Sequence, residues 1–258
     1  MSRFVNLELN PEFEGHSGED RQVTKDAAYY LDQARLAFEE GGFDRALRQY
    51  SKVLEFDPQN GAAWAGQVRA LIEMGEFREA RLWADKALER FPNEAELLAA
   101  KGVALGRLGD LDAAMSFSDA AVGEHGESPY IWLARADVLL ARAERRADFC
   151  FDKALAMAPR DWFIHWLAAR IRFYYQQMAH ALKLAQQALE WSPGRSAVWL
   201  LAGLCQRDLG LIGAARVSLV QASQLNPRCE EAGQALRTLG QVGVGARVIG
   251  WIRSLFKA

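Results

Sequence analysis

Apolar residues recur at intervals of three and four along most of the chain, which is the pattern of helices that bury one face. The spacing predicts one helix over residues 61–74 and a second over residues 77–91. Residues 75–76 are Gly-Glu and predict a tight turn, and Pro92 ends the second helix. This stretch therefore predicts a helix–turn–helix unit.

The same unit returns with a period close to 34 residues. In each unit an alanine lies on the second helix, twelve residues before a proline or glycine that ends it, and another small residue follows seven positions later. A fixed period between about 20 and 50 residues is typical of stacked arrays. The alanines are Ala46, Ala80, Ala114, Ala147, Ala181 and Ala215, and the residues that end the units are Pro58, Pro92, Gly126, Pro159, Pro193 and Pro227.

Four of the six units have a glycine turn between their two helices, whereas the fourth and fifth units lack the turn glycine. Turns equivalent to Gly75-Glu76 are expected at residues 42–44, 109–110 and 210–211, each of which begins with glycine. In the fourth unit one turn residue is missing around residues 142–144, and no glycine is present there. We expect this deletion to shorten a loop and to alter the local helix crossing.

This pattern resembles the tetratricopeptide repeat (TPR) family. The resemblance rests on an aromatic residue in the first helix, the glycine turn, the paired small residues and the terminal proline. Leu98 and His165 depart from it, because they replace the aromatic residue in the third and fifth units. The aromatic positions that fit are Tyr30, Trp64, Trp132 and Trp199.

The resemblance implies an all-α fold, a right-handed superhelical solenoid of about six TPR units with a capping helix. Residues 1–26 precede the array as an extension that is partly extended or disordered. Its apolar and polar residues alternate, so it could also add to a partner's sheet or lie along its own groove. The units cover 27–60, 61–94, 95–128, 129–161, 162–195 and 196–229. Residues 230–239 are expected to form the capping helix, 240–245 a glycine-rich linker, and 246–258 an amphipathic C-terminal helix.

In this family the first helices line a concave face, and the resemblance places a partner-binding groove there. Aromatic and leucine side chains at these positions, rimmed by arginines, suit an apolar protein segment with acidic residues. The alternative is that the superhelix closes tightly and the same side chains are core. The predicted partner-binding residues of the groove are Arg35, Arg69, Tyr130, Asp137, Phe163, Trp166, Arg170, Phe173 and Arg207.

One known ligand of the family can be excluded from the sequence. Chaperone adaptors of this family hold a C-terminal carboxylate with lysine and asparagine side chains. At the positions where the clamp needs lysine or asparagine, this chain has Leu31, Arg35 and Gly66. At the two further clamp positions, which need lysine and arginine, it has Glu96 and Ala100. A clamp of this kind is therefore not expected.

The C-terminal segment combines apolar and cationic residues. Its large apolar side chains fall on one helical arc and its three cations on the other. We expect it to dock on the array or on a second copy, to bind a partner, or, less favourably, to lie on an anionic membrane. Its predicted contact residues are Trp251, Ile252, Leu255 and Phe256.

Composition and charge narrow the function classes. Half of the residues are hydrophobic and a quarter are charged, as in globular proteins, and a formal net charge of −2 gives no overall field for nucleic acid. No apolar run is long enough for a membrane span, and the start lacks a secretory core. These features predict a cytoplasmic protein, and the excess of arginine over lysine fits a GC-rich bacterial genome.

Catalytic and metal-binding patterns are missing from the sequence. The three cysteines and four histidines show no metal-ligand spacing. His165 occupies an aromatic core slot, and Cys150 and Cys205 fit buried positions. The glycines near the C-terminus do not have the spacing of a phosphate-binding loop. We therefore expect no enzyme, no cofactor and no metal, and predict a protein-interaction scaffold or adaptor. The alternatives are a membrane-peripheral assembly factor anchored by its C-terminal helix and a regulatory subunit of an enzyme complex.

Overall fold

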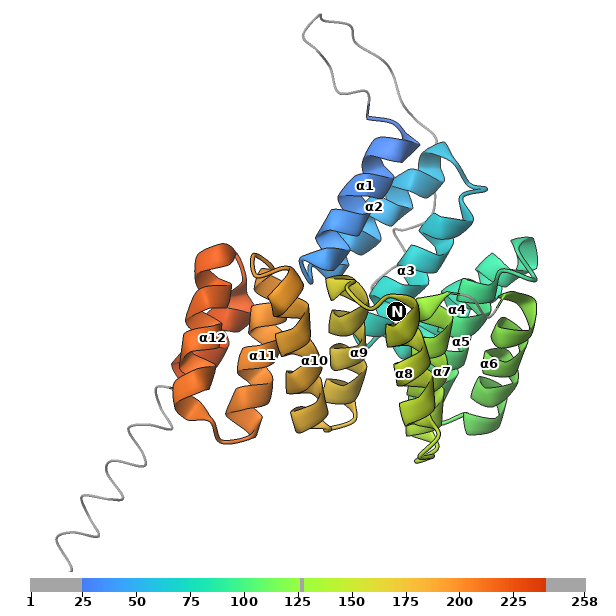
Figure 1. The fold of residues 1–258 in the computed structure, drawn as a ribbon. Helices are drawn as coiled ribbons and strands as arrows, with labels where there is room; N and C mark the ends of the chain where they lie inside the picture. The colour runs from blue at the N-terminus through green and yellow to red at the C-terminus, as the bar shows by residue number, and fades with distance from the viewer. Residues whose placement is uncertain (1–24, 126–127, 240–258) are drawn as a thin grey trace, which may run out of the picture. The chain divides into compact units, whose positions relative to one another are not determined.

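The computed structural model describes residues 25–125 and 128–239, and the described residues form helices and turns without a β-strand (Figure 1). A further helical segment covers residues 230–239. The chain divides into two compact units, residues 1–154 and 155–258. The helices are α1 Ala27–Glu39, α2 Phe43–Phe56, α3 Gly61–Glu73, α4 Phe77–Arg90, α5 Ala95–Leu108, α6 Leu111–His125, α7 Pro129–Ala141, α8 Ala147–Met157, α9 Trp162–Tyr174, α10 Met178–Trp191, α11 Ser196–Asp208 and α12 Ile212–Leu225.

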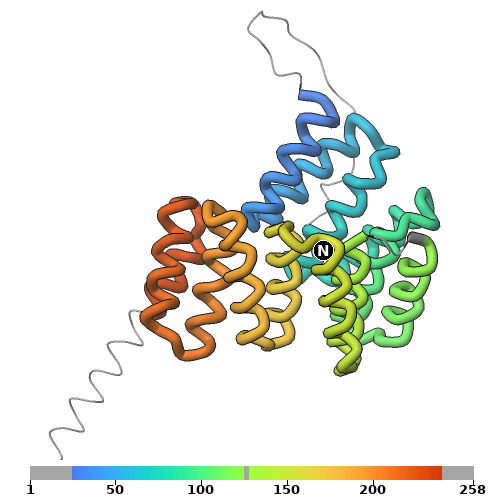
Figure 2. The backbone as a smooth tube through the Cα atoms, viewed as in Figure 1, coloured from blue at the N-terminus to red at the C-terminus, as the bar shows by residue number. Residues whose placement is uncertain are grey.

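Successive helices form hairpins that stack in chain order within each unit, as the backbone trace shows (Figure 2). In the first unit α1, α3, α5 and α7 contact one another in sequence, while α2, α4 and α6 each pack between two of them. In the second unit α9 and α11 are in contact, and α10 packs against both. The all-α helical-repeat architecture is thus confirmed. Within each of the two compact units, the first helices of the repeats form one layer.

The six turns inside the repeats share one hydrogen bond. In each turn an amide donates to the carbonyl five residues earlier, from Gly42 to Ala37 at 2.8 Å in the first repeat and from Leu211 to Gln206 at 2.8 Å in the last. This bond closes a helix end whose following residue has positive φ. Glycine supplies that residue in four repeats, whereas Ala143 (φ 57°) and Gln176 (φ 59°) supply it in the fourth and fifth.

The missing residue of the fourth repeat lies at the start of its second helix, not in the turn between its two helices. The prediction that a turn residue is missing around residues 142–144 is therefore wrong about the location. The positive-φ turn of this repeat is intact at Ala143. Helix α8 has 11 residues, whereas α10 has 14. Ahead of α8 the amide of Ala147 donates to the carbonyl of Glu144 at 3.2 Å, which makes a tight turn where the other repeats have a helical turn.

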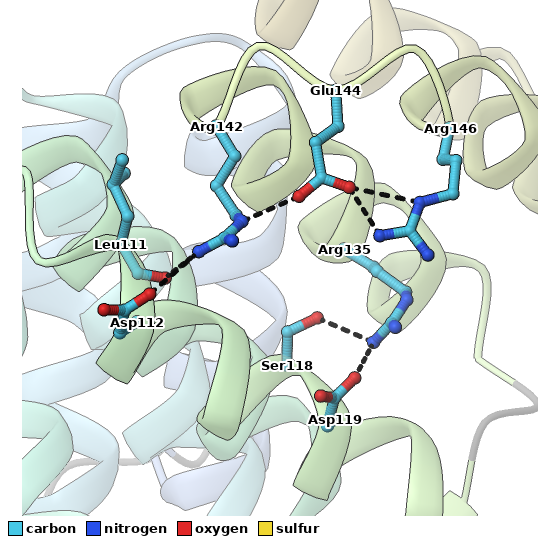
Figure 3. Close-up of polar contacts among 8 residues, drawn as sticks. All are labelled: Leu111, Asp112, Ser118, Asp119, Arg135, Arg142, Glu144 and Arg146. Carbon is cyan, nitrogen blue, oxygen red and sulfur yellow. Dashed lines mark hydrogen bonds and ion pairs between the residues drawn. The ribbon is translucent and has the colours of Figure 1, made fainter.

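An ionic cluster joins this shortened segment to the preceding repeat (Figure 3). Arg142 donates from Nη1 to the carbonyl of Leu111 and to the carboxylate of Asp112, both at 3.2 Å. Glu144 accepts from Arg142 Nε at 2.7 Å and from Arg146 Nη2 at 2.5 Å. These two hydrogen bonds lower the pKa of the Glu144 carboxyl below its usual value. The cluster therefore connects the turns of the third and fourth repeats.

Small side chains set the distance between the two helices of a repeat. The six alanines that mark the period are at most 1% exposed. A second buried position with a small residue recurs once on each first helix. At Gly203, which occupies this position in the last repeat, an added Cβ would lie 2.7 Å from Leu219 Cγ. The position 34 residues after Gly203 is Arg237, which is exposed on helix 230–239. This helix therefore cannot accept a second helix at the same close distance. The recurring residues are Ala34, Val68, Gly102, Ala136, Ala169 and Gly203.

Candidate functional site

The most distinctive polar side chain on the first-helix layer of residues 25–154 is Arg69. Its guanidinium lies between two aromatic rings, with Cζ 3.9 Å from the ring centroid of Tyr130 and 5.6 Å from that of Phe38. Stacking on a ring face holds the guanidinium plane and favours its charge. Helices α1, α3 and α7 supply these three side chains, so the arrangement exists only when several repeats stack.

A carboxylate from α5 completes the arrangement. Glu96 Oε2 lies 3.5 Å from Arg69 Nη1, and Glu96 Oε1 accepts a hydrogen bond from Ser128 Oγ at 2.9 Å. We refer to Phe38, Arg69, Glu96, Ser128 and Tyr130 as the Arg69 site. The side chain of Arg69 is 19% exposed, and within the described residues its guanidinium makes this long ion pair and no hydrogen bond. An arginine has five N–H donors, so donors of Arg69 are left for a bound partner.

Two tyrosines pack beside Arg69. Burial raises the pKa of Tyr130 well above its usual value, and the nearby charge of Arg69 opposes that rise. Burial also raises the pKa of Tyr50, whose neighbours include Arg69 and the exposed Arg35. The Tyr50 ring lies against Gly66, where an added Cβ would be 2.3 Å from Tyr50 Cζ. Both phenols therefore stay neutral at physiological pH.

A buried ion pair lies farther along the same layer. Asp137 on α7 accepts from Arg107 on α5, at 2.6 Å from Nη2 and 3.3 Å from Nε. The two side chains are 1% and 5% exposed. Arg107 also lies 5.6 Å from the ring centroid of Phe77. This pair joins two adjacent first helices below the surface.

In residues 155–239, α9 carries a group of aromatic side chains with arginines beside them. Trp166 is fully buried, and its ring centroid lies 5.8 Å from that of Phe163 and 5.3 Å from Cζ of Arg170. The half-buried Trp162 lies 4.0 Å below Cζ of Arg195. Around the buried Trp166, the partly exposed side chains of Trp162, Phe163, Arg170 and Arg195 combine aromatic rings with positive charge.

Comparison with known proteins shows which fold the chain shares. The profile of the Tetratricopeptide repeat family matches residues 37–103. A tetratricopeptide repeat protein from Parabacteroides merdae ATCC 43184 has a similar structure, with a TM-score of 0.54 and 18% identity over 83% of this chain and 84% of that one. Together with the helix hairpins of the described residues, these similarities show the tetratricopeptide repeat fold.

Other tetratricopeptide structures support the same fold. A thermophilic TPR protein from Thermus thermophilus gives a TM-score of 0.54 with 21% identity, over 70% of this chain and 99% of that one. The human IFIT1 dimer with m7Gppp-AAAA gives 0.55 with 15% identity, over 88% of this chain and 67% of that one. Sequence comparison with curated proteins finds no significant match.

The TPR fold brings only some of the predicted contact residues together. Arg69 and Tyr130 meet in the Arg69 site, and Arg35 is exposed nearby. Asp137 and Trp166 are 1% and 0% exposed, so we correct their assignment: they support Arg107 and Arg170 and do not lie at the surface.

The remaining predicted residues divide in a similar way. Phe163 and Arg170 lie together on α9, whereas Phe173 packs against the core cluster that contains Leu204 and Leu219. Arg207 Nε pairs with Asp208 Oδ1 at 2.7 Å. Trp251, Ile252, Leu255 and Phe256 lie outside the described residues.

Sequence reasoning missed several members of these groups. Glu96 occupies the same repeat position as Tyr130 and Phe163, so the positional rule of the TPR family could have found it. Arg107 lies one residue beyond the groove positions and forms its pair with a residue 30 positions away, so no local signal points to it. Trp162 and Arg195 lie at the two ends of the fifth unit, so no local signal points to their contact.

The described residues offer neither a membrane span nor a metal-binding cluster. No helix in residues 25–125 or 128–239 is long and apolar enough to cross a bilayer. Over the same ranges, no group of three or more histidine, cysteine or acidic side chains is placed to hold a metal ion.

Proposed function

We propose that this TPR protein is a non-enzymatic scaffold or adaptor that binds a protein segment on the first-helix layer of residues 25–154. TPR folds are generally scaffolds for protein–protein interaction, and the Arg69 site supplies a specific place for such an interaction. The observation that carries the proposal is the position of Arg69 between Phe38 and Tyr130, with hydrogen-bond donors left for a partner.

The energetics of Arg69 favour a role in binding. Binding energy in protein interfaces concentrates on a few tryptophan, tyrosine and arginine side chains in well-packed positions. Stacked on Tyr130, the guanidinium of Arg69 is fixed before a partner arrives, so little side-chain entropy is lost on binding. Glu96 holds it at 3.5 Å, a distance from which a partner's carboxylate can compete for the N–H groups.

The surrounding side chains suggest the chemistry of the partner. Arg35 is exposed one repeat earlier and forms no ion pair within the described residues. The half-buried ring of Tyr130 offers an apolar surface beside Arg69. A segment with an acidic residue next to an apolar residue therefore fits the Arg69 site best.

Selection from a displayed peptide library tests the proposal. The immobilised full chain should enrich peptides in which an acidic residue adjoins an apolar one. We expect Arg69→Ala to lower the affinity for the selected peptides by about 10- to 100-fold, as for an interface hot spot. Arg69→Lys should lose most of this affinity as well, because it keeps the charge but loses the planar guanidinium.

A matched control separates site binding from general attraction to positive charge. Arg81 is exposed on the outer helix α4, and Arg81→Ala removes the same charge from a different face. We expect this variant to bind like the unmodified chain. Equal losses for Arg69→Ala and Arg81→Ala, with both variants folded by circular dichroism, would refute the Arg69 site.

A further inference from the structure

The outer face of α12 differs from the outer faces of the other second helices. Among its exposed residues Arg216 is the single charged one, whereas each of the other second helices exposes between two and five charged side chains. Large apolar side chains gather there instead. The exposed residues of this strip, between 39% and 66% accessible, are Leu211, Val217, Val220 and Leu225.

The strip is unusual at these repeat positions. Val217 corresponds to Lys183 on α10, one repeat earlier, and Val220 corresponds to Gln186. Both earlier residues are exposed and polar, as expected for the solvent face of a helix. An apolar strip at the same positions of the last complete repeat points to a contact that the earlier repeats do not make.

We propose that residues 246–258 of the same chain dock on this strip of α12. The segment carries Val248, Ile249, Trp251, Ile252, Leu255 and Phe256 on one arc, and burying each of them is worth roughly 1.5–3 kcal/mol. Residues 246–258 and the strip of α12 are therefore both apolar. The strip belongs to the last complete repeat, and the segment follows the array in the sequence.

The end of helix 230–239 favours this occupant. Leu239 is 1% exposed and packs with Leu219 of α12, so the chain leaves the described structure beside that helix. Residues 240–246 can span roughly 23–25 Å when extended, about twice the diameter of a helix. The segment can therefore reach the outer face of α12 within its own chain.

Charge and repeat register agree with this placement. Glu230 and Glu231 are exposed on helix 230–239, and their charge is opposite to that of Arg247, Arg253 and Lys257. The segment cannot close a seventh repeat in the usual way, because Arg237 replaces the small residue on which a second helix packs. The outer strip of α12 gives its apolar arc another place to bury.

Cysteine cross-linking in the full chain tests the docking. On a Cys229→Ser background, Val217→Cys is combined with Ile252→Cys, and disulfide formation under mild oxidation is followed by non-reducing electrophoresis and mass spectrometry. Cys150 and Cys205 are buried and leave the readout clear. The control pair joins Ile252→Cys with Lys183→Cys, at the equivalent exposed position of α10.

The expected result is an intrachain disulfide that forms at least about tenfold faster for the Val217 pair than for the Lys183 pair, because docking raises the local concentration of the thiols. The rate should not depend on protein concentration. Equal rates for the two pairs would overturn the proposal, and a predominantly interchain product would assign the strip to a second copy. Flotation of the full chain with phosphatidylserine vesicles, together with no preference for Val217, would assign the segment to a membrane surface.

Discussion

Asp137 accepts two hydrogen bonds from Arg107, although the two residues belong to neighbouring repeats and lie 30 positions apart in the chain. Both side chains are almost completely buried, so each charge requires compensation, and this pair supplies part of it. The pair therefore holds α5 and α7 in register.

Removing one partner of this pair should destabilise the first unit strongly. We expect Asp137→Ala to lower the free energy of unfolding by about 3–5 kcal/mol, because it leaves the Arg107 charge buried. The double variant Arg107→Met with Asp137→Leu should recover most of this loss. Chemical denaturation followed by circular dichroism measures both, and a double variant as unstable as the single one would contradict this account.

Gly66 is required by the ring of Tyr50. A methyl group at this position would lie 2.3–2.7 Å from three ring atoms, so either the ring or the helix must move. We expect Gly66→Ala to destabilise the fold by about 1–3 kcal/mol through overpacking.

A matched glycine separates this clash from helix propensity. Gly123 also lies in a helix, α6, but an added Cβ there meets nothing within 4 Å. Gly123→Ala should stabilise the protein by about 0.5–1 kcal/mol, because alanine has the higher helix propensity. Thermal melts that shift in the same direction for both variants would show that the Tyr50 contact does not govern Gly66.

The ionic cluster at the fourth repeat should make stability depend on pH. Hydrogen bonds from Arg142 and Arg146 lower the folded-state pKa of Glu144. A carboxyl with a lowered folded pKa stabilises the fold above its ordinary pKa, near 4.5, and loses that contribution as the pH falls through the folded value. We expect the difference in Tm between the unmodified chain and Glu144→Gln to be present at neutral pH and to shrink below about pH 4.5.

Salt provides the control for this cluster, since exposed ion pairs are screened. The same Tm difference should decrease when ionic strength rises from about 0.1 M to about 1 M. A difference that does not change with pH or salt would show that Glu144 acts through packing instead.

The fold could be predicted largely from the sequence because repeat physics is local and periodic. The small residue at Ala80 and its equivalents, the turn glycines and the terminal prolines each have a short-range cause, and the structure confirms the repeats that they define. The site was harder to predict. Arg69 and Tyr130 lie on predicted groove positions, but a position rule cannot distinguish an exposed side chain from one that a neighbouring repeat buries. For that reason the position rule places Asp137 and Trp166 in the groove, although both are buried.

The turn of the fourth repeat shows the same limit. The sequence reveals that a residue is missing, but not whether the turn or the second helix loses it. The hydrogen bond from Glu144 to the carbonyl of Leu139, at 2.9 Å, keeps the turn as in the other repeats. The start of the second helix is shortened instead. The residues before α8 form a tight turn, and Ala147 stays at the buried position of the repeat.

The central claim is that Arg69 binds a carboxylate of a partner segment, and a double-mutant cycle tests it most directly. Isothermal titration calorimetry would measure the unmodified chain and Arg69→Ala, each with a selected peptide and with its variant in which the acidic residue is replaced by the neutral amide. We predict a coupling free energy of at least about 1.4 kcal/mol, a factor of ten in affinity, between Arg69 and that residue. Strictly additive losses, with no coupling between the two changes, would contradict the account.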